Sequence, residues 1–386
     1  MENTETGPRI YSDEEIQPAV QELFSQQHLI DGMKVFLPEA LNQLVLKEKD
    51  TVSSITEFQA RIILPVMKAI EKSSIDKLTT TGLDHLNPNE RYLFISNHRD
   101  IILDSAFLNT VLFENGFTTG QIAIGDNLMK HRMSELIFRI NKSFVVKRTG
   151  SPIELYRYSV LLSEYIRKQI VEKIDSVWIA QREGRAKDGN DRTQAGLLKM
   201  LSLSCTGDLK QYFQDLNIVP VSISYEYDPC DILKAREYLK KQADPEYKKA
   251  FQEDVEQMLL GLRGAKGRVH FHFGTPLIEA LEVFDTVPKG KKQLEILASL
   301  IDQSIHAHYN LLPVNYVAYD LLMESNGFAD HYSSEERQQL ETYFNTRCAQ
   351  MVEEKENAGR KYLLGMYANP VINHLAAIGV EINTKG

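Results

Sequence analysis

The sequence predicts an α/β fold: a mixed, largely parallel sheet flanked by helices on both faces, with helical N-terminal and C-terminal extensions. Two patterns predict it. Between residues 79 and 276, short runs of β-branched and aromatic residues alternate with helix-length segments. This alternation is typical of parallel strands joined by crossover helices, which cover both faces of the sheet. Outside this stretch, apolar residues recur at three- and four-residue spacing, which indicates helices.

The first region, residues 13 to 77, is predicted to be helical. Pro18, Pro38 and Pro65 are expected to break or kink it into several pieces. The strand candidates that follow are residues 92–95, 121–124, 143–146, 177–180, 218–223 and 269–273. Helix-length segments separate most of them, for example residues 126–140 and 153–171.

Two long helices are predicted after Pro288, over residues 289–310 and 334–356. A Ser-x-x-Glu pattern at Ser333 and Glu336 marks the start of the second. The predicted organisation is therefore a helical N-terminal region (1–78), an α/β domain (79–315) and a helical C-terminal extension (316–386).

The composition limits the classes of function. The chain of 386 residues has 43% hydrophobic and 25% charged residues, as an ordinary globular protein does. Its 44 Lys and Arg residues against 53 Asp and Glu residues give a net charge of −9, which argues against a nucleic-acid partner. Cys205, Cys230 and Cys348 lack disulfide or zinc-site spacing, so a reducing compartment is expected and no metal site is predicted.

The first candidate site follows the strand candidate at residues 92–95. His98 stands at the exit of this apolar run, with Asp100 and Asp104 in the next six residues. A histidine held by a buried strand can take a proton from a hydroxyl, and a nearby carboxylate can fix its tautomer. Asp104 is the favoured partner of His98, because Asp100 follows too closely to fold back easily. Asp100 remains the alternative.

Polar residues also follow three other strand candidates. Lys147 and Arg148 follow the run at 143–146, and residues 181–185 follow the run at 177–180. Residues 219–226 overlap the strand candidate at 218–223 and extend past its end. Because the carboxyl ends of parallel strands meet at one edge of a sheet, these places are expected to converge with His98 on one site.

In this order, the four places resemble the four sequence blocks of the glycerol-phosphate and lysophospholipid acyltransferase superfamily. The blocks correspond to Asn97-His98, residues 144–148, Glu183-Gly184-Arg185 and Val219-Pro220. The sequence departs from the family pattern in the first block, where Asp104 lies six positions after His98 instead of five. It also lacks the usual ending of the third block.

The resemblance implies an O-acyltransferase of phospholipid biosynthesis. Such an enzyme moves a fatty acyl group from acyl-CoA or an acyl-carrier protein to the hydroxyl of glycerol 3-phosphate or a lysophospholipid such as lysophosphatidate. His98 would be the general base and Asp104 its orienting acid. No bound cofactor is expected. The residues implied in phosphate binding are Arg148, Lys147, Glu183, Gly184 and Arg185.

Other basic residues could widen this positive zone or could be ordinary surface charges. They are Lys130, His131, Arg132, Lys142, Arg182, Lys187 and Arg192. Two rival functions also stay open. One is a catalytically silent relative that binds lipid or protein, and the other is a thioester hydrolase that uses the same histidine with water.

The expected location follows from what the sequence lacks. It begins without a basic stretch and apolar core, and no apolar run approaches the roughly 20 residues of a spanning helix. We therefore expect a cytoplasmic protein without a transmembrane helix, peripheral at the inner face of the cell membrane. Apolar helical residues in the first 77 positions and at residues 362–367 support contact with a membrane surface.

Overall fold

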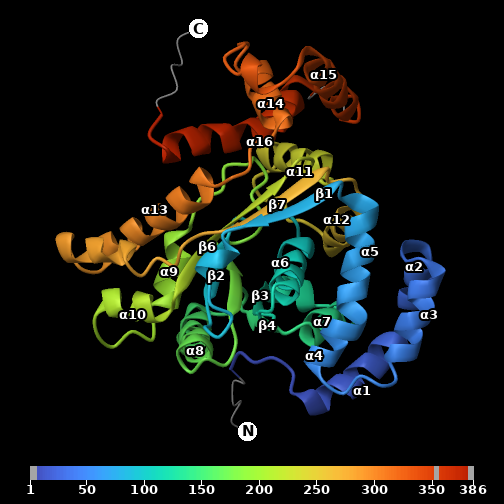
Figure 1. The fold of residues 1–386 in the computed structure, drawn as a ribbon, viewed down its shortest axis with the longest axis vertical. Helices are drawn as coiled ribbons and strands as arrows, with labels where there is room; N and C mark the ends of the chain where they lie inside the picture. Colours follow the sequence, from blue (N-terminus) through green and yellow to red (C-terminus); the bar gives the residue numbers. More distant parts are fainter. Residues whose placement is uncertain (1–6, 352–355, 381–386) are drawn as a thin grey trace.

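The computed structural model of the protein describes residues 7–351 and 356–380 (Figure 1). Its centre is a seven-stranded sheet in the order β1-β7-β6-β2-β5-β3-β4. Strands β6, β2, β5, β3 and β4 run parallel, β7 is antiparallel to β6, and β1 is parallel to β7. The predicted mixed, largely parallel α/β sheet is therefore confirmed. The strands are β1 (Lys77–Thr81), β2 (Leu93–Ser96), β3 (Gln121–Gly125), β4 (Ser143–Val146), β5 (Val177–Ala180), β6 (Ile218–Tyr225) and β7 (Arg268–Phe273).

All six strand candidates are strands in the structure, with ends within two residues of the prediction. The sequence did not predict β1, because its Lys-Leu-Thr-Thr-Thr segment has no apolar run. The central residues of β1 are partly buried and its two ends are exposed, and it pairs only with β7 at one edge of the sheet.

Helices cover both faces of the sheet, so the central strand β2 contributes side chains to a core on each face. Phe94 lies in the hydrophobic core under α6 (Leu103–Glu114), whereas Leu93 and Ile95 lie in a second core. Successive strand residues point to opposite faces, so β2 is buried on both sides. The helices that line the second core are α8 (Pro152–Val171), α9 (Ala195–Leu201), α10 (Leu209–Asp215) and α13 (Lys291–Ala307).

The predicted helical N-terminal region contains five α-helices. Pro38 is the N-cap of α3 and Pro65 lies in the first turn of α5, as expected of a proline at a helix start. Pro18, in contrast, lies inside α1 and does not end it. The elements are α1 (Asp13–Phe24), α2 (Gln27–Phe36), α3 (Glu39–Glu48), α4 (Ile55–Phe58), a π-helical turn η1 (Gln59–Ile63) and α5 (Leu64–Ser74).

The last helices form a separate core with α11. Ser333 caps α15 as predicted, because its hydroxyl accepts from Glu336 N at 3.1 Å and its own N–H donates to Glu336 Oε2 at 2.8 Å. The predicted helix over residues 334–356 ends earlier, at Cys348, and residues 352–355 lie outside the described part. These helices are α14 (Pro313–Leu322), α15 (Ser334–Cys348) and α16 (Glu356–Ala377).

Residues 362–367, expected to face a membrane, belong mostly to this core instead. Leu363, Leu364, Met366 and Tyr367 are at most 3% exposed. They therefore hold α16 in the protein. Within residues 7–351 and 356–380, none of the helices has the length and apolar character needed to cross a bilayer.

The remaining elements connect these layers. The antiparallel strands β6 and β7 are connected by two helices, α11 (Asp231–Ala243) and α12 (Phe251–Arg263). The short elements are η2 (Leu83–His85), η3 (Asp126–Met129), α7 (Arg132–Ile140), η4 (Ala280–Thr286) and η5 (Ala329–His331). The predicted domain boundaries after residues 78 and 315 stay predictions.

Candidate active site

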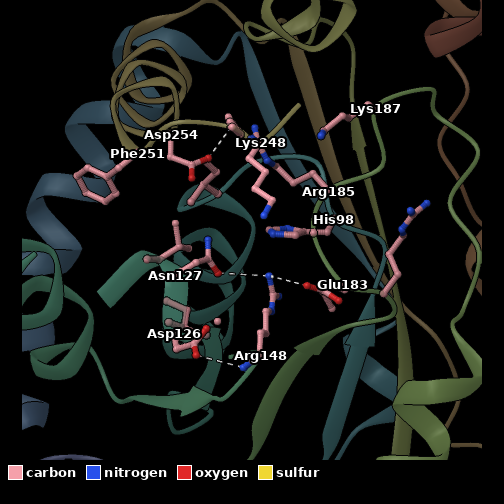
Figure 2. A pocket seen from close by; sticks show the side chains of 18 of the residues that line it. His98, Asp126, Asn127, Arg148, Glu183, Arg185, Lys187, Lys248, Phe251 and Asp254 are labelled. Atoms are coloured by element: carbon pink, nitrogen blue, oxygen red, sulfur yellow. Dashed lines mark hydrogen bonds and ion pairs between the residues drawn. The ribbon is translucent and has the colours of Figure 1, made fainter. Parts of the chain in front are cut away.

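A cavity of about 910 Å³ opens at the carboxyl ends of the parallel strands (Figure 2). Residues that end or follow β2, β3, β4 and β5 line it, as expected when parallel strands finish at one rim. In Figure 2, His98 lies between two groups of side chains. Asp126, Asn127 and Arg148 lie on one side of it, and Lys248, Phe251 and Asp254 lie on the other.

His98 and Asp104 are in direct contact. Nδ1 of His98 lies 2.8 Å from Oδ2 of Asp104, and the Asp104 side chain is fully buried. Because an ionised carboxylate only accepts hydrogen bonds, this contact places the ring proton on Nδ1. The other ring nitrogen, Nε2, is then the one that can receive a proton in the cavity.

The extra residue between His98 and Asp104 is absorbed by a tight turn over residues 97–104, here called the His98 turn. Asp104 Oδ2 also accepts from the backbone N–H groups of Arg99 at 2.6 Å and Asp100 at 3.0 Å. Asp100 Oδ1 accepts from the N–H groups of Ile102 at 2.9 Å and Leu103 at 2.8 Å, where α6 begins. Asp104 therefore contacts the histidine, while Asp100 binds backbone N–H groups at the start of α6.

Side chains from neighbouring strands fix the base of this turn. Asn97 bridges to β6, since its Nδ2 donates to the carbonyl of Ile223 and its Oδ1 accepts from the N–H of Ile223, both at 2.8 Å. Trp178 of β5 meets the His98 ring edge-on, with 5.5 Å between ring centroids, and its Nε1 donates to Ser96 Oγ at 2.9 Å. Residues from three strands thus hold His98 in place.

Glycine 261 of α12 lets a helix approach the His98 turn closely. A Cβ added at Gly261 would lie 2.2 Å from Oδ2 of Asp100, closer than any real side chain allows. Burial, followed by the charge of Asp104, raises the pKa of Asp100. Packing of α12 therefore closes this side of the turn.

Arg148 follows β4 and reaches the cavity. Its Nη1 lies 3.3 Å from Asn127 Oδ1 and 3.5 Å from Glu183 Oε1. Gly125, at the end of β3, leaves room for the guanidinium, because a Cβ there would lie 2.7 Å from Arg148 Cζ. With 31% of its side chain exposed, Arg148 keeps donors for an anionic ligand.

The loop after β5 supplies Glu183, Gly184 and Arg185. Gly184 has a φ of 68°, a left-handed conformation that favours glycine. Arg185 is 9% exposed and donates through Nη2 to Gln257 of α12. Its Nη1 is buried and has no hydrogen-bond partner among the described residues, and the residue lines the cavity.

Tyr225 is the last residue of β6, and its side chain lies close to Asp104. Burial, and then the charges of Asp104 and Asp100, raise the pKa of Tyr225 well above its usual value. The hydroxyl interacts electrostatically with Asp104, but it does not meet the geometry of a hydrogen bond. Tyr225 is therefore a neutral neighbour of the acid.

The structure brings most of the predicted site residues together. His98, Arg148, Glu183, Gly184 and Arg185 line one cavity. Lys147 is not brought to this lining, and its ammonium lies 4.7 Å from the ring centre of Tyr158. Of the further basic residues, Lys130, Arg182 and Lys187 line the cavity. The others have partners elsewhere: the His131 ring packs, tilted, against Phe251, Arg132 pairs with Glu22, Lys142 pairs with Asp175, and Arg192 donates to Asn373.

Sequence reasoning missed several lining residues. Asp126 and Asn127 follow β3, so the same rule about strand ends would have found them. Asp126 ties β3 to β4 by accepting from Thr149 Oγ1 at 2.7 Å. Trp178 carried no signal, because an aromatic residue inside a strand is usually core. Among the described residues, no group of three or more His, Cys, Asp or Glu side chains has metal-site geometry.

Comparisons with known proteins find relatives of one kind. Proteins named glycerol-3-phosphate acyltransferase align with this chain at 27% identity over 262 residues in Ectopseudomonas mendocina and at 24% over 327 residues in Pseudomonas putida strain W619. These alignments cover 63% and 80% of this chain but 30% and 38% of the relatives. The chain thus spans less than two fifths of the length of the curated relatives it matches. No protein-family model matches it.

A solved structure, the 1-acyl-sn-glycerophosphate acyltransferase PlsC from Thermotoga maritima, aligns with 73% of this chain and 96% of its own. The sequence identity is 11% and the TM-score is 0.35.

Proposed function

We propose that this chain belongs to the glycerol-phosphate and lysophospholipid acyltransferase superfamily and is an O-acyltransferase, which its similarity to proteins named glycerol-3-phosphate acyltransferase supports. It moves a fatty acyl group from a thioester to the hydroxyl of glycerol 3-phosphate or a lysophospholipid such as lysophosphatidate, as a step of phospholipid biosynthesis. The observation that carries the proposal is the 2.8 Å contact between His98 and Asp104 at the rim of a cavity that Arg148 also lines.

The reaction needs a base, because a glycerol hydroxyl is a poor nucleophile. Nε2 of His98 takes the hydroxyl proton as the oxygen bonds to the thioester carbon, a contribution of roughly 10²–10⁴ in rate. The C–S bond then breaks, and the leaving thiolate takes the proton back from the imidazolium. Asp104 keeps the ring oriented and stabilises its transient positive charge. No covalent bond to the protein is required.

The acceptor phosphate is assigned to Arg148 and Arg185. Both guanidinium groups line the cavity with His98, and each retains donors that its protein partners do not use. Guanidinium groups match phosphate oxygens in two-point contacts, which orient the acceptor as well as hold it. Glu183, 3.5 Å from Arg148, positions that cation or binds a glycerol hydroxyl.

We also propose that the protein works in the cytoplasm, peripherally at the inner face of the cell membrane, where its lipid product belongs. Helix α2 has no buried residues, and Val35 on it is 73% exposed. Leu44 on α3 is 38% exposed. Apolar side chains on such helices can enter the interface of a bilayer. Sedimentation with anionic phospholipid vesicles tests this, and protein that stays entirely in the supernatant contradicts it.

A product analysis tests the proposed reaction against its rivals. Purified protein is incubated with radiolabelled acyl-CoA or acyl-carrier protein and with glycerol 3-phosphate or lysophosphatidate. The proposal predicts a labelled acylated lipid whose formation requires an acceptor. Labelled free fatty acid without acylated lipid indicates a thioester hydrolase. Unchanged thioester with every donor and acceptor indicates a silent relative, and either result contradicts the proposal.

A further inference from the structure

The cavity continues beyond His98 toward the connection between α11 and α12. Four lysines line this end, here called the lysine end, and they come from two separate parts of the chain. Lys187 follows β5, whereas the other three lie at the end of α11 or in the loop before α12. Those three are Lys241, Lys248 and Lys249. Figure 2 shows Lys187 and Lys248 on the side of His98 away from Asp126 and Asn127.

The charge of the cavity is opposite to that of the chain. Eight Lys or Arg residues line it against four Asp or Glu residues, while the whole chain has a net charge of −9. Counting Glu237, which is 4% exposed and lies behind the lining, leaves eight cations against five carboxylates. The cavity therefore attracts anions in a protein that otherwise repels them.

The carboxylates at the lysine end are shared among several lysines. Glu237 forms ion pairs with Lys187 and, at 3.2 Å, with Lys241, and Lys249 pairs with Asp254. Glu237 has an oxygen, Oε2, that lies 3.9 Å from Lys249. One buried acid thus gathers three ammonium groups at one place, which gives the lysine end positive charge that a phosphate could neutralise.

Aromatic rings accompany these lysines. Tyr238 stacks on Tyr362, with 4.1 Å between ring centroids and 19° between planes, and both line the cavity. Phe251 and Tyr247 line it as well. Tyr238 remains 37% exposed. An exposed ring such as that of Tyr238 beside cations suits a ligand with a flat base and phosphates. A base stacks on an aromatic side chain while lysines bind the phosphate oxygens.

From this juxtaposition we propose that the lysine end binds the phosphorylated nucleotide of coenzyme A, so that the acyl donor is acyl-CoA and its thioester lies at His98. This inference rests on the proposed acyltransferase function. A volume of about 910 Å³ is that of a site for a cofactor-sized molecule. The cations line the same cavity as His98, as a small ligand that reaches His98 requires. An acyl-carrier protein would instead be expected to meet basic residues on an outer surface.

Trp178 provides a way to measure binding without catalysis. It is the single tryptophan of the chain, it lines the cavity, and its ring meets that of His98. Quenching of its fluorescence can follow titration with CoA. We expect adenosine 3′,5′-bisphosphate, which has the base and phosphates but no thiol arm, to compete with CoA for the wild-type protein. Saturable CoA binding that the bisphosphate does not displace overturns the inference.

Variants locate the nucleotide on the lysine end. A K241Q/K248Q double variant removes two exposed ammonium groups and leaves the pair between the partly buried Lys187 and the buried Glu237 intact. It should bind CoA about tenfold more weakly than the wild type, because hydrogen bonds between ammonium groups and phosphates contribute at least about a factor of ten to affinity. Affinity for acyl-pantetheine, which lacks the nucleotide, should not change. The matched control is Lys291→Gln on α13, whose lysine side chain is 92% exposed and lies outside the cavity lining.

The results separate this inference from the proposed function. Lysine-dependent CoA binding without any acyl transfer supports the inference and contradicts the function. Acyl transfer that uses acyl-pantetheine as well as acyl-CoA supports the function and overturns the inference. Equal CoA affinity in the double variant and the wild type also overturns it, as does transfer from acyl-carrier protein by a protein that binds no CoA.

Discussion

At one end of the cavity, His98 is held by buried groups of the sheet. At the other end, lysines lie after β5, at the end of α11 and in the loop before α12. Asp104 is fully buried and accepts three hydrogen bonds within one turn. Lys241 and Lys248, in contrast, are exposed. The sheet end therefore has few ways to rearrange, while the long side chains of the lysine end can adjust to a ligand.

This difference suits the two ends of the cavity to different tasks: proton transfer at the sheet end and binding of an anionic ligand at the lysine end. A proton transfer needs its groups held within a fraction of an ångström, which strand ends and buried caps provide. Attraction of a polyanion needs positive charge but little fixed geometry, which lysines provide. Changes at the sheet end are thus expected to lower kcat, and changes at the lysine end to raise the KM for the donor.

The largest effect is expected from Asp104→Asn. The asparagine oxygen can still accept from the backbone and from His98 Nδ1, but a neutral amide cannot stabilise the positive charge that His98 gains in the reaction. We expect kcat to fall about 10²–10⁴-fold with little change in either KM. Steady-state kinetics with both substrates varied would measure this. A kcat near that of the wild type would mean that the contact between His98 and Asp104 does not serve the reaction.

A second expected loss comes from Gly261→Ala, far from any ligand. The added methyl group would collide with Asp100, so the His98 turn must shift. A small displacement of reacting groups can cost roughly 10–100-fold in kcat. Gly365→Ala in α16 is the control, because nothing lies within 4 Å of its added Cβ, and it should leave activity unchanged. Equal activities of the two variants would show that α12 does not hold the turn.

Arg148→Lys should affect the acceptor more than the donor. Lysine keeps the positive charge but loses the planar fork that binds two phosphate oxygens. The KM for glycerol 3-phosphate or lysophosphatidate should rise about tenfold, and the KM for the donor should not change. If the donor KM rises instead, Arg148 binds the donor, and the assignment of donor and acceptor to different ends of the cavity is wrong.

The smallest effect is a pH dependence at the lysine end. Burial lowers the pKa of Lys187 to about 8. As pH rises from 7 to 9, Lys187 loses its proton, and with it an attraction for the donor phosphates, so the donor KM should increase several-fold. Lys187→Arg stays charged over this range and should remove the increase. A donor KM that follows the same pH profile in both proteins would contradict this assignment.

The sequence predicts the parts of the molecule that depend on local pattern. Apolar runs identified six of seven strands, and their parallel ends predicted that His98, Arg148 and Arg185 would share a site. The rule was applied too narrowly, since Asp126 and Asn127 follow β3 in the same way. Spacing favoured Asp104 over Asp100 as the neighbour of His98, and Asp104 is the one in contact with it. The backbone bonds that shape this turn follow from no spacing rule.

The lysine end could not be predicted. Lys241, Lys248 and Lys249 lie in an ordinary charged segment of the sequence, and their place in the cavity depends on how α11 and α12 pack over the sheet. The same holds for residues 362–367. Their apolar pattern fits a membrane surface as well as a protein core, and only the packing of α14, α15 and α16 places them in a core. Long-range packing decides such cases.

The most direct test of the account is single-turnover acyl transfer by His98→Ala. Trp178 fluorescence would first show that the variant binds CoA as the wild type does, so that a loss of rate cannot come from a loss of binding. Our account predicts normal binding and a transfer rate reduced at least about 10²-fold. Transfer at the wild-type rate by this variant would contradict the role of His98 as the general base.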